Sequence, residues 1–147
     1  MQLQVESNPA FNTVTAYGTD YIEINAVSYQ HAVFFGPEGS VSRWDARSVS
    51  DITASLLRLA AGIGDSRKAD PLAFLDEAPA QRPPQAPEIL LVGTGRDQHF
   101  LPARVTQELI SLGIGVEAMS TQAAARTYNI LMAEGRRVIA ALLPLEP

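Results

Sequence analysis

Short apolar segments that partly alternate with polar residues fill the first third of the chain. A glycine-containing connection at residues 18–20 joins two such segments, 13–17 and 21–25. Alternation of this kind is typical of strands that are buried on one face. A second connection, at residues 36–39, has proline at its second position and glycine at its fourth, as tight turns often do. Residues 1–45 therefore predict a β-meander of three or four strands.

The C-terminal half alternates between apolar runs and helical patterns. Residues 89–92 form an uninterrupted apolar run, which is typical of a strand buried on both faces, and the segments 115–119 and 136–143 predict two further strands. Apolar residues recur at helical spacing in three segments, at residues 51–61, 102–112 and 122–134. Ser50 is the expected N-cap of the first helix. The order of these elements favours right-handed crossovers around a largely parallel α/β sheet.

Between these two halves the composition changes. Five of the ten prolines lie between residues 71 and 87. A loop of this length without regular structure is unusual inside a compact domain. The length of 147 residues is typical of one domain. We therefore predict a single domain, residues 1–147, with a proline-rich insertion or mobile loop at 62–87.

Composition excludes several classes of function. The chain has no cysteine, so disulfides, thiolate catalysis and cysteine-ligated metals are excluded. Eleven basic residues against sixteen acidic residues give a net charge of −5, the wrong sign for a general nucleic-acid binder. No apolar run approaches the roughly 18 residues that span a bilayer, and no secretory signal is visible. We expect a cytoplasmic bacterial protein with no transmembrane segment.

Sequence motifs do not indicate catalysis, a metal or a cofactor. Gly93, Thr94 and Gly95 follow a buried strand, as a dinucleotide-binding turn would, but Gln98 stands where that motif requires glycine. The glycines are better explained by a tight turn with positive φ. The two histidines are far apart in the sequence, and no nucleophile motif is present. We predict no catalytic residues, no metal ligands and no cofactor.

A polar cluster on the third predicted helix is the best candidate for a ligand site. Thr121 lies at the helix N-terminus, where free N–H groups favour anions, and Arg126 and Asn129 share roughly one face. If this end lies beside residues 93–95, the two segments meet where α/β sheets bind ligands. The alternative is structural: Thr121 caps the helix, Asn129 bonds a neighbouring loop and Arg126 pairs with a glutamate.

Four segments carry a resemblance to a known family: PEILLVGTG (87–95), GIGVEAM (113–119), TQAAARTYNIL (121–131) and EGRRV (134–138). With them the chain resembles the Mth-type domain of unknown function, the family that includes mitochondrial NADH:ubiquinone oxidoreductase (complex I) assembly factor 3 and the adipogenesis-associated Mth-domain protein. The resemblance implies an α/β fold, a three-layer domain with a mixed central sheet, an N-terminal β-meander layer and flanking helices. It implies no established catalytic residues.

Two hypotheses follow for function. The first is a non-catalytic protein-interaction or assembly-factor-like domain whose partner is another protein; a homo-oligomer is left open. The alternative is a small-anion or small-ligand binder, or an unrecognised enzyme, that uses the crevice between Gly93, Thr94, Gly95 and Thr121–Asn129. A deep crevice lined by Thr94, Arg126 and Asn129 that holds an anion would favour the alternative. An exposed apolar patch of roughly several hundred Å² with no pocket would favour the first.

Overall fold

The computed structural model describes residues 11–63 and 86–146. Residues 1–10, 64–85 and 147 lie outside the described residues, and with them most of the predicted insertion. In chain order the elements are β1 (Val14–Tyr17), β2 (Ile22–Ile24), β3 (Val27–Tyr29), β4 (Val33–Phe35), β5 (Ser42–Arg43), the 3₁₀ turn η1 (Val49–Asp51), α1 (Ala54–Ala60), β6 (Ile89–Gly93), α2 (Ala103–Ser111), β7 (Gly115–Met119), α3 (Thr121–Ala133) and β8 (Val138–Leu142).

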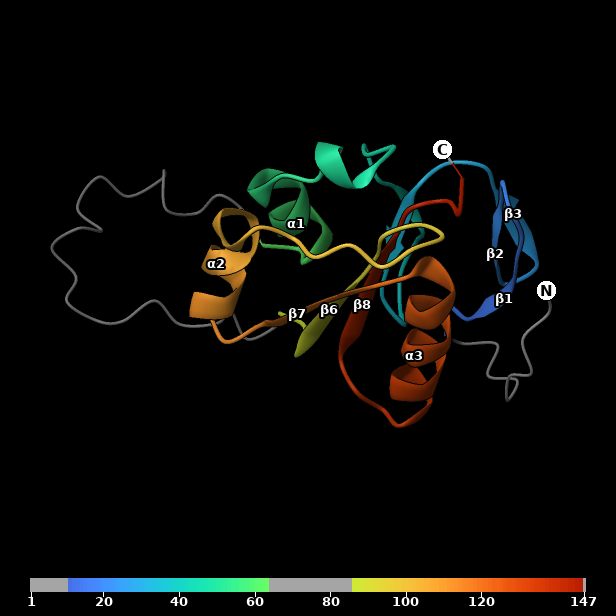
Figure 1. Cartoon of the computed structure of the whole chain (residues 1–147). Helices are drawn as coiled ribbons and strands as arrows, with labels where there is room; N and C mark the ends of the chain where they lie inside the picture. The colour runs from blue at the N-terminus through green and yellow to red at the C-terminus, as the bar shows by residue number, and fades with distance from the viewer. Residues whose placement is uncertain (1–10, 64–85, 147) are drawn as a thin grey trace, which may run out of the picture.

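A five-stranded mixed sheet forms the centre of the molecule (Figure 1). Its strand order is β5-β4-β8-β6-β7, with β7, β6 and β8 parallel and β4 antiparallel to β8. The apolar run of β6 lies in the middle of the parallel part, where its backbone is bonded on both sides. The predicted α/β class and mixed sheet are therefore confirmed.

Alternate residues of β6 enter two separate hydrophobic clusters, one on each face of the central sheet. Leu90 and Val92 belong to the cluster that includes buried residues of α1 and α2. Leu91 belongs to the other cluster, with buried residues of α3 and of strands β1 and β2. The central sheet is thus covered by helices α1 and α2 on one face, and by α3 with the N-terminal strands on the other (Figure 1).

The N-terminal strands divide between two sheets. Strands β1, β2 and β3 form a separate antiparallel sheet, whereas β4 and β5 extend the central sheet. Strand β3 was not predicted, because the turn before it has Asn25 and Ala26 at positive φ, 52° and 66°. Two consecutive residues at positive φ are typical of a type I′ hairpin, whose usual sequence signal is Asn-Gly rather than Asn-Ala.

The first helix begins later than predicted. Ser50 is not its N-cap but lies inside η1, and the side chain of Thr53 instead accepts the N–H of Leu56 at 3.2 Å. The carboxylate of Asp51 accepts the backbone N–H groups of Arg47 and Ser48 at 3.0 and 3.2 Å. Because this carboxylate closes a local turn, the α-helix starts only after it. The other two predicted helices are present with their ends shifted by one residue.

Asn12 joins the N-terminal segment to the rest of the molecule. Its side-chain amide donates to the carbonyl oxygens of Gly36 and Gly39, both at 2.9 Å. The backbone carbonyl of Asn12 accepts the hydroxyl of Tyr128 at 2.7 Å. Burial raises the pKa of Tyr128 well above its ordinary value, so the phenol stays protonated and remains a donor. This bond ties α3 to the chain that enters β1.

Candidate functional site

Four of the six residues predicted to bind a ligand meet at the carboxyl ends of the parallel strands. The hydroxyl of Thr121 accepts the N–H of Gly95 at 2.9 Å and donates to the carbonyl of Leu143 at 2.7 Å. The backbone N–H of Thr121 donates to the carbonyl of Gly95 at 2.8 Å. Gly93 lies against the same side chain, since a Cβ there would be 2.8 Å from the Thr121 hydroxyl oxygen. Thr121, the first residue of α3, therefore joins this helix to the chain at the ends of β6 and β8.

Thr94 is also bonded within the protein. Its buried hydroxyl lies 2.7 Å from the carbonyl oxygen of Asp97 and 3.1 Å from that of Met119, and it accepts the N–H of His99 at 3.2 Å. Gly95 has a φ of 98°, as the predicted tight turn requires. These contacts fix the loop that follows β6.

The remaining two predicted residues, Arg126 and Asn129, lie away from this junction. The Asn129 amide pairs with the edge of β1: its oxygen accepts the N–H of Val14 at 3.0 Å and its nitrogen donates to the Val14 carbonyl at 2.9 Å. Arg126 is exposed on α3 and has no ion pair or hydrogen bond within the described part of the chain. Helical phase alone did not show that these side chains point to different neighbours.

A crevice of about 340 Å³ lies directly outside the loop that follows β6. Thr94 and Gly95 form part of its wall, and the charged or titratable side chains on it are Arg47, Arg96, Asp97 and His99. Arg96 is ion-paired with Glu146. The crevice is at the strand ends where the sequence predicted a ligand site, but most of its side-chain charge comes from residues that the sequence did not indicate.

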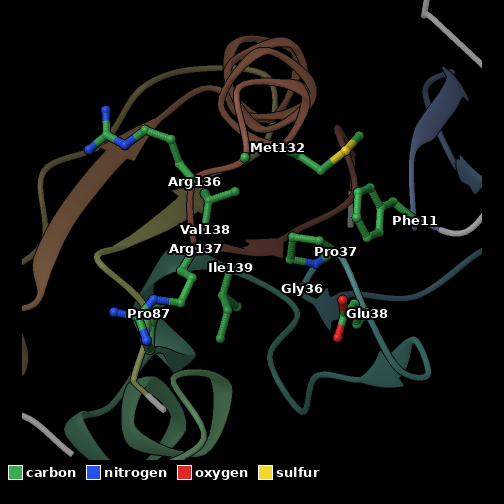
Figure 2. A pocket seen from close by; sticks show the side chains of 11 residues that line it. Phe11, Gly36, Pro37, Glu38, Pro87, Met132, Arg136, Arg137, Val138 and Ile139 are labelled. Carbon is green, nitrogen blue, oxygen red and sulfur yellow. The ribbon is translucent and has the colours of Figure 1, made fainter. Parts of the chain in front are cut away.

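A second concavity, which we call the groove, lies at the opposite end of the parallel strands and has a volume of about 380 Å³ (Figure 2). Its wall is mainly apolar and comes from the segment before β1, the turn after β4, the segment before β6, and the stretch from the end of α3 to the start of β8. The lining residues are Phe11, Gly36, Pro37, Glu38, Pro87, Met132, Gly135, Arg136, Arg137, Val138 and Ile139.

Two arginines lie on one side of the groove, and Met132 extends toward Phe11 across it (Figure 2). The guanidinium of Arg136 pairs with the carboxylate of Glu88 at 3.0 Å, and this pair is about half exposed, with side-chain exposures of 49% and 39%. No pattern in the sequence predicted the groove. The available signal was the pair of arginines immediately before a buried strand, within the EGRRV segment.

The described residues were also compared with the requirements of a metal site and of a membrane-spanning helix. Within residues 11–63 and 86–146, no three histidine or acidic side chains lie close enough together to hold a metal ion. None of the helices in these ranges is long and apolar enough to cross a bilayer.

Comparison with known proteins agrees with the fold. A solved structure from Bordetella pertussis, described as an Mth938-like domain, is 57% identical, has a TM-score of 0.78 and aligns over 99% of this chain and 94% of its own. An uncharacterized protein of Rhodobacter capsulatus is 53% identical over 58 residues, which cover 40% of this chain and 47% of the relative.

A third relative has a descriptive name. The zebrafish (Danio rerio) protein named NADH dehydrogenase [ubiquinone] 1 alpha subcomplex assembly factor 3 is 44% identical over 57 residues, 39% of this chain and 33% of the relative. The chain thus spans less than half the length of either curated relative. The profile described as "Protein of unknown function (DUF498/DUF598)" matches residues 14–143. The chain therefore belongs to this family, the Mth-type domains.

Proposed function

We propose that this protein is a non-catalytic, assembly-factor-like domain that binds another protein through the groove. The groove is the observation that carries the proposal. Its wall joins apolar side chains from segments far apart in the sequence, including Phe11, Met132 and Ile139, with arginines at its side. Apolar pockets next to arginine are typical of the places where a partner inserts an anchoring side chain.

Two further observations support a binding role. The hydroxyl groups of Thr94 and Thr121 at the strand-end junction form hydrogen bonds with backbone groups of the protein itself, so they have a structural role there. The zebrafish relative is named as an assembly factor, which supports an assembly role at the level of the family. The occupant that we propose is a protein segment with an apolar anchor, because the lining is predominantly apolar.

The groove can be tested with two matched serine substitutions. Phe11 lines the groove, whereas Ile130 is 58% exposed on α3 and is not part of the groove wall. We expect Phe11→Ser to abolish capture of partner polypeptides from a lysate of the native organism, because it removes an apolar wall. Ile130→Ser should capture the same set as the unsubstituted protein. Quantitative mass spectrometry measures the captured polypeptides, and circular dichroism checks that both variants are folded.

Equal capture by all three proteins would refute the groove as the binding surface. Reproducible absence of any captured polypeptide, under conditions that retain the fold, would refute the proposed function as a whole.

The strand-end crevice supports a second candidate, a small-anion site. Arg47, Arg96 and His99 lie on its wall, beside the turn that the sequence predicted for ligand binding. The ligand would contact these side chains together with Thr94 and Gly95 of the wall. Gly93 and Thr121, which were also predicted, are buried behind the wall and would position it. Arg126, the other arginine predicted to bind the ligand, is exposed on α3 and is not part of the crevice wall, so its contribution is tested separately.

Substitutions of Arg96 and Arg126 distinguish an anion held by the crevice alone from an anion that also contacts α3. We expect phosphate to raise the thermal midpoint of the unsubstituted protein if the crevice binds anions. Arg96→Ala should remove that increase, and Arg126→Ala should remove it only if the arginine of α3 takes part. Because Arg126 is exposed, its substitution should change stability by less than about 1 kcal/mol. A midpoint that phosphate leaves unchanged would rule out this candidate for phosphate.

A further inference from the structure

Strand β7 forms one edge of the central sheet, next to β6 (Figure 1). Within the described residues, no strand pairs with its other side. The strand has five residues, Gly115–Met119, and in its middle Glu117 is exposed while Val116 and Ala118 are half-buried. An edge strand presents backbone donors and acceptors that can pair with another chain.

The backbone bonds to β6 show which groups point outward. The N–H of Gly115 donates to the carbonyl of Glu88 at 3.0 Å, and the carbonyl of Met119 accepts the N–H of Thr94 at 2.8 Å. In a parallel pair, alternate residues direct both backbone groups to the same neighbour, so Gly115, Glu117 and Met119 face β6. Val116 and Ala118 therefore direct their N–H and C=O groups away from the sheet.

One of these four outward groups is already occupied by a side chain. The amide nitrogen of Gln98 donates to the carbonyl of Ala118 at 3.1 Å. An amide donor in this position takes the place that a backbone N–H of an added strand would have. The edge therefore accepts amide donors, and the N–H and C=O groups of Val116 and the N–H of Ala118 remain open within the described residues.

The charge of Glu117 indicates what could pair with this edge. Glu117 has no ion pair within the described residues. An antiparallel pairing of two copies that used all the outward groups would place Glu117 directly opposite Glu117 of the other copy. Like charges in directly opposite positions destabilise a sheet, and opposite charges stabilise it. The edge therefore disfavours a second copy and favours a segment with a basic residue.

We propose that β7 adds an extended segment of a partner protein as a sixth strand, with a lysine or arginine of that segment opposite Glu117. The backbone groups of Val116 and Ala118 supply the hydrogen bonds, and Glu117 selects the partner by charge. This inference rests on the proposed function, that the chain binds another protein, and adds a second contact at the β7 edge, which is not part of the groove wall.

A short peptide tests the edge directly. The probe is Thr-Val-Lys-Val-Thr with both ends blocked, and the matched control peptide has glutamate in place of lysine. With ¹⁵N-labelled protein, we expect the lysine peptide at millimolar concentration to shift the amide signals of Val116 and Ala118 and to slow their hydrogen exchange. The glutamate peptide should bind about tenfold more weakly, because its charge repels Glu117.

Three substitutions change the edge in different directions. Gln98→Ala frees the carbonyl of Ala118 and should strengthen peptide binding several-fold. Ala118→Pro removes an outward N–H that β6 does not use, which an edge strand tolerates, and should abolish binding. Glu117→Lys keeps the backbone unchanged and should reverse the preference, so that the glutamate peptide binds better. This charge exchange tests the proposal even if the proline variant does not fold.

The edge proposal is overturned if Val116 and Ala118 do not respond to the lysine peptide, or if both peptides bind equally. It is also overturned if Glu117→Lys leaves the preference unchanged. Signals of β7 that change with protein concentration in the absence of peptide would assign the edge to a second copy instead. A protein that captures partners from lysate but ignores the peptide would retain the proposed function and lose only this inference.

Discussion

Replacing Leu91 with aspartate is expected to prevent folding. Leu91 is fully buried in the middle of β6, with Glu117 of β7 and Ala140 of β8 as its neighbours in register. Its side chain packs in the cluster between the central sheet and α3. A carboxylate in that position is buried without a partner and costs several kcal/mol, against a total stability of about 5–15 kcal/mol. Circular dichroism and thermal unfolding would measure the loss.

Leu91→Met is the matched control, because it nearly conserves volume and apolar character. Its cost should stay below about 1.5 kcal/mol. If Leu91→Asp melted at the same temperature as the unsubstituted protein, the assignment of β6 to the centre of the core would be wrong.

The elements of the C-terminal half could be predicted because their signals are local. The apolar run that became β6 has no polar residue to expose, and Pro102 and Gly113 limit the second helix in the sequence itself. The predicted parallel crossovers also follow from the order of these elements. The sheet order β8-β6-β7, with β6 in the middle, agrees with the apolar run of β6 and with the order of the elements.

The N-terminal half depended on signals that are not local. The separation of β1, β2 and β3 from the central sheet follows from pairing between β4 and β8, more than 100 residues apart. The bonds of Asn12 to Gly36 and Gly39 and to the hydroxyl of Tyr128 also join distant segments. A polar residue in a loop does not show from its own neighbourhood that it is buried.

The candidate site could be predicted only in part, because some of its contacts also join segments that are distant in the sequence. The meeting of Gly93, Thr94, Gly95 and Thr121 follows from the general rule that the carboxyl ends of parallel strands share one edge. The pairing of Asn129 with the backbone of Val14 spans 115 residues and could not be seen in the helix alone. The groove combines four separate segments, so its arginines were the available signal for it in the sequence.

Replacing Thr121 with valine is expected to lower the stability of the protein strongly, because this residue holds the strand-end junction together. The two side chains have nearly the same shape, so the change removes the hydroxyl and little else. It leaves the N–H of Gly95 and the carbonyl of Leu143 without their partner in a fully buried position. Each buried group that loses its hydrogen bond costs about 1–3 kcal/mol.

We therefore expect Thr121→Val to lose roughly 2–6 kcal/mol of stability, measured by urea unfolding. Thr121→Ser keeps the hydroxyl and removes one methyl group, so it should lose only about 1 kcal/mol. The order of the two variants distinguishes a structural hydroxyl from one reserved for a ligand. If valine were tolerated better than serine, the hydroxyl would contribute little to folding, and its place at the strand ends would favour the anion site over the structural role.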